Sequence, residues 1–550
     1  MELNQIIIPL IVFIVLSFLI LTWRKYNKDK LEKIKEDWGK LKDEYFNFDR
    51  ISQYHNEIKK VDFQTINSQT QNDIDFEDLF VYLDRTTSRT GQQYLYHKLL
   101  TPSNDLKKLE FFNKQVIFFQ ENSNERKIIQ TILLGLKKDG SYNIPLLFSD
   151  NIFQKPKWYN LVKIDLYLTI ILSILSIKYH FLSVWLLIPL FSNFVLHFWF
   201  KNRSFNVIRS FPFLNNLINI SKKFSENNNI KYDKEVRNYI YHLNKFQNNI
   251  LFLNKRSIKI GGDIENIFYF FIDLVKGFFL VDFFIYFNSI KEVIEKRSDI
   301  EELINYVGWV DVSISVSYIR EGDKQTSIPI FTSNTKSIKY EEIIHPLIDE
   351  CISNDLIVDK KSILITGSNM SGKSTFLRTI LINQLLSQTI YTTFSKSFQT
   401  PFLKINSSIR IDDSLLDGKS YYFEEVGIVL ELIKKVEDDC NLFILDEVFK
   451  GTNTIERISS SKSILSFLNK GNNIVIVSTH DIELTTLLKD EFDLYHFCED
   501  INNDKLQFDH KLKSGELTTR NGIKLLEISN YPKEIIEESY EISKSLKRFN

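Results

Sequence analysis

The sequence predicts an α/β domain at the C-terminal end of the chain and, before it, an all-α part that includes transmembrane helices. The α/β prediction rests on short apolar runs of strand length at 363–366, 442–445 and 474–479, of which the first is followed by a glycine-bounded loop and a helical pattern. The all-α prediction rests on helical periodicity through most of the chain upstream of residue 330, together with long apolar segments that carry few charges.

Size and composition limit what the chain can be. With 550 residues it is long enough for several domains and at least one large core. Its formal net charge of −1 excludes a global field that recruits nucleic acid or anionic lipid, so any such attraction has to be local. The three widely spaced cysteines (Cys351, Cys440 and Cys498) support neither a disulfide framework nor a zinc site, and they suit a reducing compartment.

The loop after the first predicted strand has the residues of a phosphate-binding loop. Gly367, Gly372, Lys373 and Ser374 fit the pattern G-x-x-x-x-G-K-[ST], with a strand before them and the helical segment 376–381 after them. Glycines let the backbone curl so that successive N–H groups point at phosphate oxygens, and the helix N-terminus adds its positive dipole end. The pattern therefore predicts ATP and Mg²⁺ as cofactors, with Lys373 reaching the β- and γ-phosphates and Ser374 ligating the metal.

Two acids and a histidine follow the other two predicted strands. Asp446 and Glu447 come directly after 442–445, and His480 comes directly after 474–479. In phosphate hydrolases the first acid holds Mg²⁺, directly or through water, and the second orients and polarises the attacking water. A strand-end histidine on its own is more often structural, but beside the other two motifs we expect it to sense the γ-phosphate. Because ligands of open parallel sheets bind at the carboxyl ends of the strands, these residues are predicted to meet at one edge.

These motifs, with several segments around them, resemble the ATPase domain of the MutS DNA mismatch-repair proteins. Asn369-Met370 within the phosphate loop and the segment Ser478–Leu484 are similar to motifs of that family. Further similar segments are His345-Pro346-Leu347, Asp412–Leu415 with Gly418–Glu425, Lys450–Thr454, and Lys511–Gly515 with Gly522-Ile523. A weaker likeness extends upstream to Leu83–Thr86, Gly91, Pro102 and the helix around Asp311, which in the family belong to a helical core that carries levers and clamps.

The resemblance implies a fold, a site and an assembly. The fold is a P-loop NTPase domain of the ABC/MutS type, joined to an all-α core and lever domain. The nucleotide is expected to lie against Gly367, Ser368, Asn369, Met370, Ser371, Gly372, Lys373, Ser374 and Thr375. Ser374 and Asp446 are expected at the metal, and Lys373, Glu447 and His480 as catalytic residues. A homodimer with composite sites is also implied, in which Ser420 and the loop Gly451–Thr454, with Gly451 and Thr452, face the partner's ATP.

The chain departs from the family pattern in ways that bear on function. Ser368 and Ser371 stand where the family usually has proline and glycine, and Lys450 stands where arginine is usual, which is expected to keep phosphate binding but to alter the rate. Mismatch-recognising members carry a Phe-x-Glu wedge on an N-terminal domain, and the segment ahead of the core-like helices has neither that motif nor room for that domain. Mismatch reading by a wedge is therefore not expected.

Three apolar segments are predicted to cross a membrane. Ile6–Trp23 carries no charge and is followed by Arg24-Lys25, so it is predicted to be an uncleaved anchor whose C-terminal side faces the cytoplasm. Ile164–Ile177 and Phe181–Phe200 are predicted to form two crossings joined by Lys178-Tyr179-His180, which return the chain to the cytoplasmic side. The alternative for these two segments is a hydrophobic helical hairpin packed inside the protein or lying on the membrane surface.

Three more segments of the helical part have interpretable patterns. Asn202–Lys259 is basic and can either meet phosphates of DNA or lipid head groups or form a solvated helical surface. Ile267–Ile290 is aromatic-rich, but its charges (Asp273, Lys276 and Asp282) favour a buried helix over a membrane span. Glu301–Ile319 is predicted to be an amphipathic helix around Asp311.

Taken together, these features predict a domain order and a function. The order is a transmembrane anchor at 1–24, a helical stalk at 25–74, a MutS-core-like helical segment at 75–160, a transmembrane hairpin at 161–201, a helical core and lever segment at 202–330, and a P-loop ATPase domain at 331–550. The leading hypothesis is a multi-pass, bilayer-anchored MutS-like ATP hydrolase with its ATPase domain in the cytoplasm. It acts as a homodimer that couples ATP hydrolysis to a helical clamp on DNA.

Two other classes of function stay open. One is an ATP-driven membrane machine of the ABC type that does not act on DNA; the few polar residues in its spans and the lack of a Leu-Ser-Gly-Gly-Gln-like signature before Asp446 argue against it. The other is a scaffold that binds ATP without hydrolysing it. The presence of Lys373, Asp446 and Glu447 argues against the scaffold, because a scaffold has no need of a water-polarising acid.

Overall fold

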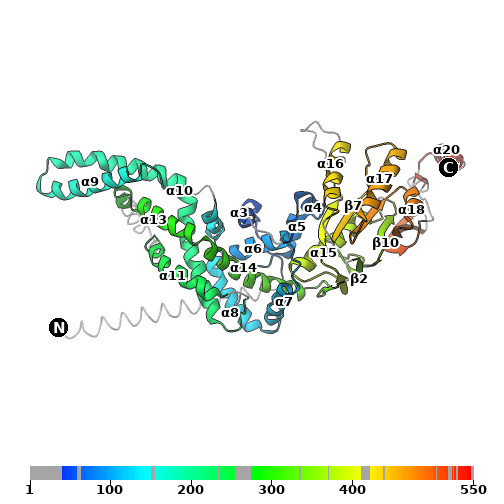
Figure 1. Ribbon diagram of the computed structural model, residues 1–550, viewed down its shortest axis with the longest axis horizontal. Helices are drawn as coiled ribbons and strands as arrows, with labels where there is room; N and C mark the ends of the chain where they lie inside the picture. Colours follow the sequence, from blue (N-terminus) through cyan, green and yellow to red (C-terminus); the bar gives the residue numbers. More distant parts are fainter. Residues whose placement is uncertain are drawn as a thin grey trace. The chain divides into compact units, whose positions relative to one another are not determined.

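The computed structural model describes most of the chain, and Figure 1 shows its helices and strands. The described residues are 32, 40–58, 63–149, 155–232, 235–253, 274–333, 336–368, 371–410, 421–437, 440–502, 505–517, 523, 526–527 and 531–546. The predicted anchor at 1–24 lies outside these residues, as do Asn369, Met370 and Ser420.

The chain divides into two units, and each is discontinuous in sequence. Unit 1 comprises Met1–Lys60, Asp84–His97 and Lys114–Ile319, and unit 2 comprises Val61–Leu83, Lys98–Asn113 and Arg320–Asn550. Two short stretches of the helical part therefore belong with the C-terminal α/β unit. The domain boundaries predicted from the sequence stay a prediction.

The described residues of unit 1 form helices. In chain order these are α2 (Phe48–Ile51), α3 (Gln53–Glu57), α6 (Arg89–Leu100), α7 (Leu106–Glu121), α8 (Ser123–Leu133), the 3₁₀ helices η1 (Leu134–Leu136) and η2 (Asp139–Phe148), α9 (Tyr159–Lys178), α10 (Leu182–Glu226), α11 (Val236–Leu253), α13 (Val281–Glu295) and α14 (Arg297–Arg320). The last residues of α6 (98–100), the first residues of α7 (106–113) and Arg320 at the end of α14 belong to unit 2.

Helix α14 forms the centre of unit 1, and its C-terminal half is buried on every side. Each residue from Tyr306 to Ile319 is buried, so the prediction of an amphipathic helix is wrong for this half. The serines that resembled a polar face are instead satisfied inside the core: Ser313 and Ser317 donate to carbonyl oxygens of the preceding turn at 2.7 Å, and the Ser315 hydroxyl accepts from the Arg85 N–H at 2.9 Å. Hydroxyls paired in this way are buried at little cost.

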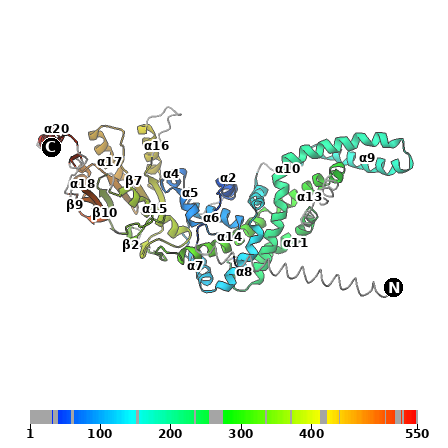
Figure 2. The same cartoon turned by 180° about the vertical axis from the view of Figure 1, so that it is seen from behind.

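Helices α9 and α10 form the hairpin that the sequence predicts at 161–201, and they run side by side in Figures 1 and 2. Tyr159–Lys178 and Leu182–Ser204 are each long and apolar enough to cross a membrane, and only 11% and 17% of their most apolar windows are buried. Ile177, Trp185 and Phe191 are 78%, 61% and 71% exposed. Packing inside the described part of the chain therefore does not account for this hairpin, because most of its apolar surface is exposed there.

Helix α13 has the buried character predicted for the segment Ile267–Ile290. Five side chains of this helix in that segment are buried: Phe283, Tyr286, Phe287, Ser289 and Ile290. The Phe283 ring lies 4.8 Å from the Phe287 ring and 5.1 Å from the Phe200 ring of α10, centroid to centroid. The part of the segment at 267–273 lies outside the described residues.

Unit 2 contains two sheets among its described residues. The larger has the strand order β10-β9-β4-β8-β7-β6, in which β10 runs antiparallel to β9 and the other neighbours are parallel. Its strands are β4 (Ser362–Thr366), β6 (Lys404–Ser408), β7 (Asn441–Asp446), β8 (Ile474–Thr479), β9 (Phe492–Asn502) and β10 (Lys505–Ser514). The smaller sheet has the order β1-β5-β2-β3, with β1 (Ile330–Phe331), β2 (Ser337–Ile343), β3 (Asn354–Asp359) and β5 (Ser397–Thr400). The three predicted strands are thus confirmed as β4, β7 and β8.

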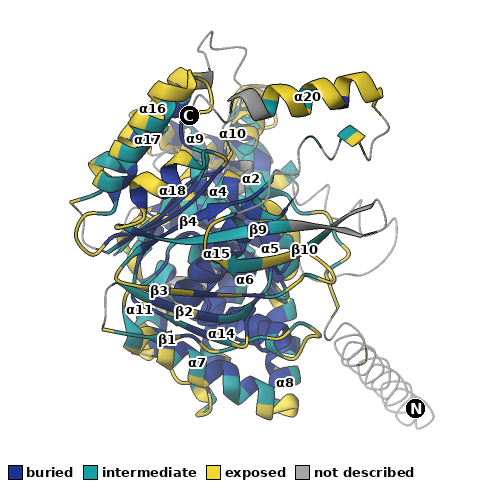
Figure 3. Ribbon diagram, turned by 90° about the vertical axis from the view of Figure 1, so that its right-hand side faces the viewer, coloured by how far each residue is buried: buried dark blue, intermediate teal, exposed yellow. Residues whose placement is uncertain are grey.

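The core of unit 2 lies on the central strands of the larger sheet, which are buried along their whole length (Figure 3). Alternate residues such as Leu364, Phe443 and Val475 pack with apolar residues of α16 (Tyr421–Lys434), α17 (Thr454–Leu468) and α18 (Glu483–Leu488). Strand residues at every second position share a face, so these three helices cover one face of the sheet. Helix α15 (Lys373–Thr389) is buried along most of its length, and α20 (Lys533–Leu546) is mostly exposed.

A segment from far upstream covers the edge strand β6. Gln64 accepts from the backbone N–H of Ile405 at 2.8 Å and donates to its carbonyl at 2.6 Å. Asp73, at the end of α4 (Ser68–Asp73), accepts from the Ser407 hydroxyl at 2.6 Å and from the Arg410 N–H at 2.8 Å. These side chains satisfy backbone groups that an edge strand leaves open. They explain why residues 61–83, which include α5 (Phe76–Leu83), belong to unit 2.

Candidate nucleotide site

The larger sheet brings the three predicted motifs to one edge. Strands β4 and β8 are neighbours, with Thr366 paired to Thr479, and β8 is paired in turn to β7, with Ser478 beside Asp446. The strands are parallel, so their carboxyl ends meet. The residues that follow them along the chain therefore lie side by side, as the sequence predicts.

The loop between β4 and α15 has backbone conformations that require glycine. Gly367 has φ +152° and Gly372 has φ +105°, where residues with a Cβ are strained. A Cβ on Gly367 would also lie 2.9 Å from the carbonyl oxygen of Phe497. Inside the loop, the Ser371 hydroxyl donates to the Ser368 carbonyl at 2.8 Å. Helix α15 begins at Lys373, so its first N–H groups face the loop, which is the arrangement that binds phosphate.

Lys373 is buried and its ammonium group connects the loop to β8. The Nζ atom donates to the carbonyl oxygens of Gly367 at 2.9 Å and Ser368 at 2.8 Å, and it lies 3.2 Å from Nε2 of His480. The lysine of the first motif and the histidine of the third are therefore in direct contact.

Asp446 lies against two hydroxyl groups. Its carboxylate accepts hydrogen bonds from the hydroxyls of Ser374, at the start of α15, and Ser478, on β8. A carboxylate and a hydroxyl are hard oxygen ligands of the kind that Mg²⁺ prefers, and this metal is commonly held by one or two carboxylates together with substrate phosphates. Ser374 and Asp446 therefore fit a Mg²⁺ site and would hold that ion through a hydroxyl and a carboxylate oxygen.

Glu447 is held by two cationic or potentially cationic groups. Its Oε1 lies 2.7 Å from Nε2 of His480, and its Oε2 lies 3.3 Å from Nζ of Lys450. Burial by itself raises the pKa of Glu447, but the hydrogen bond from His480 and the charge of Lys450 outweigh burial and lower the pKa to about 2. The side chain is therefore an anion at neutral pH and accepts hydrogen bonds.

The backbone around Glu447 is strained and is held in place by neighbours. Glu447 has φ +56° and Phe449 has φ +63°, both unusual for residues other than glycine. The Glu447 N–H donates to the carbonyl of Ser478 at 2.9 Å, and the Phe449 N–H donates to the carboxylate of Glu425 from α16. Strain of this kind persists only where the surroundings fix it, and it re-aims the Glu447 side chain toward His480.

Most of the predicted site residues that lie in the described part of the chain are thus close together. Gly367, Ser368, Ser371, Gly372, Lys373, Ser374, Asp446, Glu447 and His480 lie at one edge, and Thr375 follows on α15. Gly451 and Thr452 lie in the loop before α17, where the Thr452 hydroxyl donates to Glu456 at 3.1 Å, and their predicted contact with a partner stays a prediction. Ser420, Asn369 and Met370 lie outside the described residues.

Sequence reasoning missed three residues that shape the site. Ser478 contacts Asp446, Glu425 holds the loop after Glu447, and His510 lies 3.1 Å from the carbonyl oxygen of Ser371 through its Nδ1. The place of Ser478 in the site could have been predicted, because it stands two residues before His480 at the end of the same strand. Glu425 ends the segment Gly418–Glu425 that resembles the family, but its contact with the loop after Glu447, like the position of His510, depends on pairing between distant segments.

The chain is similar to known proteins over its C-terminal part. Residues 363–547 match the family model of MutS domain V. The "DNA mismatch repair protein MutS" of Petrotoga mobilis is 32% identical over 271 residues, which are 46% of this chain and 31% of that protein. The proteins of the same name from Leptospira interrogans and Staphylococcus haemolyticus are 30% and 28% identical over 271 and 261 residues, covering 46% and 45% of this chain.

The matched part spans about a third of the length of these curated relatives, namely 31% of the first two and 28% of the third. The resemblance found in the motifs is confirmed by comparisons that cover the strands, the loop and the acids together. Over residues 363–547, the chain is therefore similar to MutS domain V and to the corresponding part of the MutS mismatch-repair proteins.

Proposed function

We propose that this chain is an ATP hydrolase of the MutS type that works as a homodimer, is held in a membrane by its helical hairpin, and acts on DNA. The observation that carries the ATPase proposal is the convergence of Lys373, Asp446, Glu447 and His480, each within hydrogen-bond or ion-pair distance of a residue from another motif. Four groups of this kind at one sheet edge match the needs of phosphoryl transfer, where catalysis consists of positioning and electrostatic stabilisation.

Each residue has a distinct role in the proposed reaction. The loop N–H groups and Lys373 bind the phosphates, and Ser374 with Asp446 holds Mg²⁺, which when bound neutralises charge on the β- and γ-phosphates. Glu447, anionic at neutral pH, orients a water molecule by accepting its hydrogen bond. His480 holds the Glu447 carboxylate in position from one side while Lys450 holds it from the other.

The dimer and the DNA ligand rest on the relatives. The similar proteins are named for DNA mismatch repair, and the loop Gly451–Thr454 at the end of β7 is open to the surface, as a partner-facing loop needs to be. Because the matches cover at most about half of this chain, duplex or branched DNA bound through its backbone is the proposed ligand, without selection for mismatches.

The membrane proposal rests on the hairpin of α9 and α10. Its long apolar helices expose aromatic and aliphatic side chains over most of their surface, which in water carries a large free-energy cost and in a bilayer does not. Lys201 and Arg203 follow the second apolar segment and agree with an end on the cytoplasmic side, where we also place the ATPase domain.

The experiment that tests the ATPase proposal uses the full chain in detergent. Glu447→Gln is expected to lower the rate of ATP hydrolysis by about 100-fold or more while ATP binding persists, because the amide keeps the shape but loses the charge that orients water. The matched control is Glu437→Gln, an exposed acid after α16, which is expected to leave the rate unchanged. Unchanged turnover in Glu447→Gln would contradict the role of this residue.

A DNA-binding assay separates this proposal from an ABC-like membrane machine. Paired, mismatched and branched duplexes are titrated at several salt concentrations against the detergent-solubilised chain. Binding that weakens steeply with salt and does not distinguish mismatches supports the proposal. No binding of any duplex at low salt would reject DNA as the ligand and favour the ABC-like alternative.

A further inference from the structure

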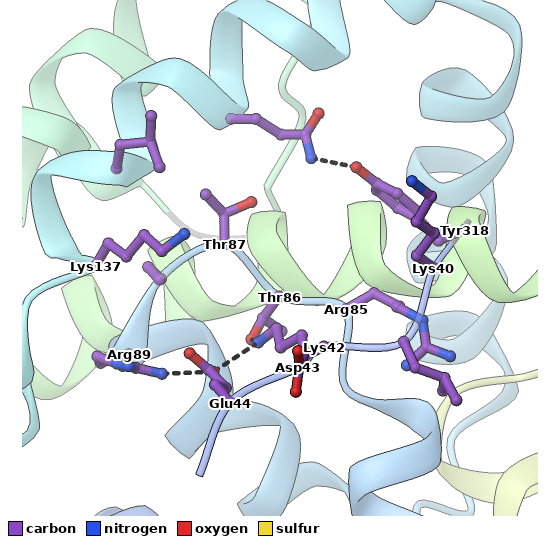
Figure 4. Close-up of a pocket in the computed structure, with 14 residues that line it drawn as sticks. Lys40, Lys42, Asp43, Glu44, Arg85, Thr86, Thr87, Arg89, Lys137 and Tyr318 are labelled. Carbon is purple, nitrogen blue, oxygen red and sulfur yellow. Dashed lines mark hydrogen bonds and ion pairs between the residues drawn. The ribbon is translucent and has the colours of Figure 1, made fainter. Parts of the chain in front are cut away.

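A cavity of about 380 Å³ lies wholly within unit 1 and takes no part in the candidate nucleotide site. Its walls come from the loop 40–44, the loop and helix start at 85–89, the end of α8 with η1, and helix α14 (Figure 4). The volume falls in the range of small-molecule sites. None of the binding or catalytic residues that the MutS resemblance implies lines this cavity.

The wall is strongly cationic. Five basic side chains line the cavity (Lys40, Lys42, Arg85, Arg89 and Lys137), against the two acids Asp43 and Glu44. Such an excess of one sign in a concave, partly enclosed site concentrates anions. The cations that are not paired inside the protein therefore favour a negatively charged ligand.

Part of this positive charge is already compensated inside the protein. Arg89 is paired with Glu44 at 2.7 Å, and Lys42 is paired with Asp84 at 2.8 Å. Lys40 and Lys137 are exposed and have no ion pair with a carboxylate in the described part of the chain. Figure 4 places them on opposite sides of the cavity, with Thr87 between them. These two ammonium groups are the ones available to a ligand.

The loop that forms the floor is held rigidly, which pre-forms the cavity. The buried Asp311 carboxylate accepts from the N–H of Thr87 at 2.8 Å, from the N–H of Ser88 at 2.8 Å and from the Ser88 hydroxyl at 2.6 Å. Asp84 accepts from the Thr86 N–H at 2.9 Å and from the Thr86 hydroxyl. With its backbone fixed, the loop directs the Thr87 side chain between the two lysines without further ordering on binding.

The far wall holds a buried amide with one unsatisfied end. Gln130 is 3% exposed, and its Nε2 donates to the Tyr318 hydroxyl at 2.8 Å, while its Oε1 has no hydrogen-bond partner among the described residues. Turning the amide over only exchanges which end is unpaired. An unpaired buried polar atom lowers stability, so a ligand that supplies a hydrogen bond here gains affinity.

We propose that this cavity binds a small phosphate monoester, such as a sugar phosphate or a nucleoside monophosphate. The phosphate pairs with Lys137 and accepts from Thr87, Lys40 adds positive charge at the other end of the cavity, and a hydroxyl or amine of the organic part pairs with Gln130. A phosphate is an anion that a lysine ammonium group and a hydroxyl bind well. Inorganic phosphate leaves Gln130 unpaired and most of the volume empty, so the organic group is part of the recognition.

The test uses the full chain in detergent, with binding measured by calorimetry and by the shift in melting temperature. The probes are ribose 5-phosphate, AMP, inorganic phosphate and ribose. AMP is measured on the Lys373→Ala variant, so that the candidate nucleotide site does not contribute. We expect one or both esters to bind more tightly than inorganic phosphate, and ribose not to bind. This result does not depend on whether the chain hydrolyses ATP.

Three variants assign the binding to this cavity. Lys40→Gln combined with Lys137→Gln is expected to weaken ester binding about tenfold or more, and Gln130→Leu to weaken ester binding but not phosphate binding. Lys138→Gln is the matched control, because this neighbouring exposed lysine does not line the cavity.

Several outcomes would overturn the proposal. They are no ester binding at millimolar concentration, ester binding that the double lysine variant leaves intact, tighter binding of inorganic phosphate than of either ester, or displacement of a bound ester by duplex DNA.

Discussion

Nε2 of His480 lies 2.7 Å from Oε1 of Glu447 and 3.2 Å from Nζ of Lys373. A lysine ammonium group only donates, and an ionised carboxylate only accepts, so one imidazole nitrogen cannot serve both at once. The shorter distance favours donation from His480 to Glu447. His480 is thus a positioning residue for the acid that orients water, and the lysine beside it is left to pair with phosphate and the loop carbonyls.

The first prediction concerns this pair and the pH profile of ATP hydrolysis. His480→Ala removes the hydrogen bond that contributes most to lowering the pKa of Glu447, so that pKa rises from about 2 toward its ordinary value, while Lys450 still opposes the effect of burial. In the wild type, Glu447 stays ionised down to about pH 3 and does not reduce the rate between pH 7 and pH 5. In His480→Ala the rate is expected to be lower at pH 7 and to fall further on acidification through pH 5.

The pH profile distinguishes positioning from a merely structural role. The rate of each variant is measured against pH at saturating ATP, with circular dichroism to confirm folding at each pH. Parallel profiles for the wild type and His480→Ala would contradict this account of His480, even if the variant were slower. His480→Gln, whose amide can donate to Glu447, is expected to restore part of the rate.

The second prediction concerns a close approach in the centre of unit 1. A Cβ on Gly91 would lie 2.1 Å from Oδ2 of Asp311, which is bound by the loop Thr87-Ser88 and cannot move away. Gly91→Ala is therefore expected to lower the free energy of unfolding by about 3 kcal/mol, through overpacking and broken hydrogen bonds. Chemical unfolding followed by intrinsic fluorescence measures it.

Gly427 provides the control for this substitution. It lies on the exposed side of α16, and a Cβ there meets nothing within 4 Å. Gly427→Ala is expected to stabilise the helix by about 1 kcal/mol, because alanine has the higher helix propensity. If Gly91→Ala did not lower the free energy of unfolding relative to Gly427→Ala, the close packing of Gly91 against Asp311 would be contradicted.

The third prediction concerns stability against pH. Burial raises the pKa of Asp311 to about 6, although hydrogen bonds from Ser88 and Thr87 oppose the shift. A carboxyl group whose pKa is raised on folding binds a proton more tightly in the folded state. The contribution of Asp311 to the free energy of unfolding therefore falls as pH rises from about 4 to about 6 and is constant above pH 6. The total change is about 3 kcal/mol.

Asp311→Asn tests this dependence, because asparagine does not titrate. The variant is expected to be less stable than the wild type at every pH, since its amide Nδ2 faces backbone donors. The difference in stability between the two proteins is expected to be greatest near pH 4, where the wild type gains most from the proton, and smaller above pH 6. Melting temperatures at pH 4, 5, 6 and 7 measure it, and a difference that does not change with pH would contradict the raised pKa.

The fourth prediction concerns the hairpin. If α9 and α10 cross the bilayer, Lys178 at its tip and Lys157 before it lie on opposite sides of the membrane. After Cys351, Cys440 and Cys498 are replaced by serine, Lys178→Cys and Lys157→Cys are labelled in sealed vesicles with a reagent that does not cross membranes. Labelling of the two from opposite sides is expected, and labelling of both from one side would show that the hairpin lies on the surface.

The sequence by itself determined the local elements and the chemistry of the candidate nucleotide site. Strands β4, β7 and β8 are continuous apolar runs, and the glycines, lysine, acids and histidine stand directly after them. Parallel strands place their carboxyl ends together, so short-range patterns were sufficient to bring Lys373, Glu447 and His480 to one edge.

Only the tertiary structure decided what depends on contacts between distant segments. The serines of α14 look like a polar face in the sequence, but they are buried: Ser313 and Ser317 pair with carbonyls of their own helix, and Ser315 pairs with the N–H of Arg85. Residues 61–83 join unit 2 because Gln64 and Asp73 complete the edge of β6, more than 300 residues away along the chain. Periodicity reports which residues share a face of one element, but not which other segment will cover that face, and that choice is made by packing and hydrogen bonding in the folded chain.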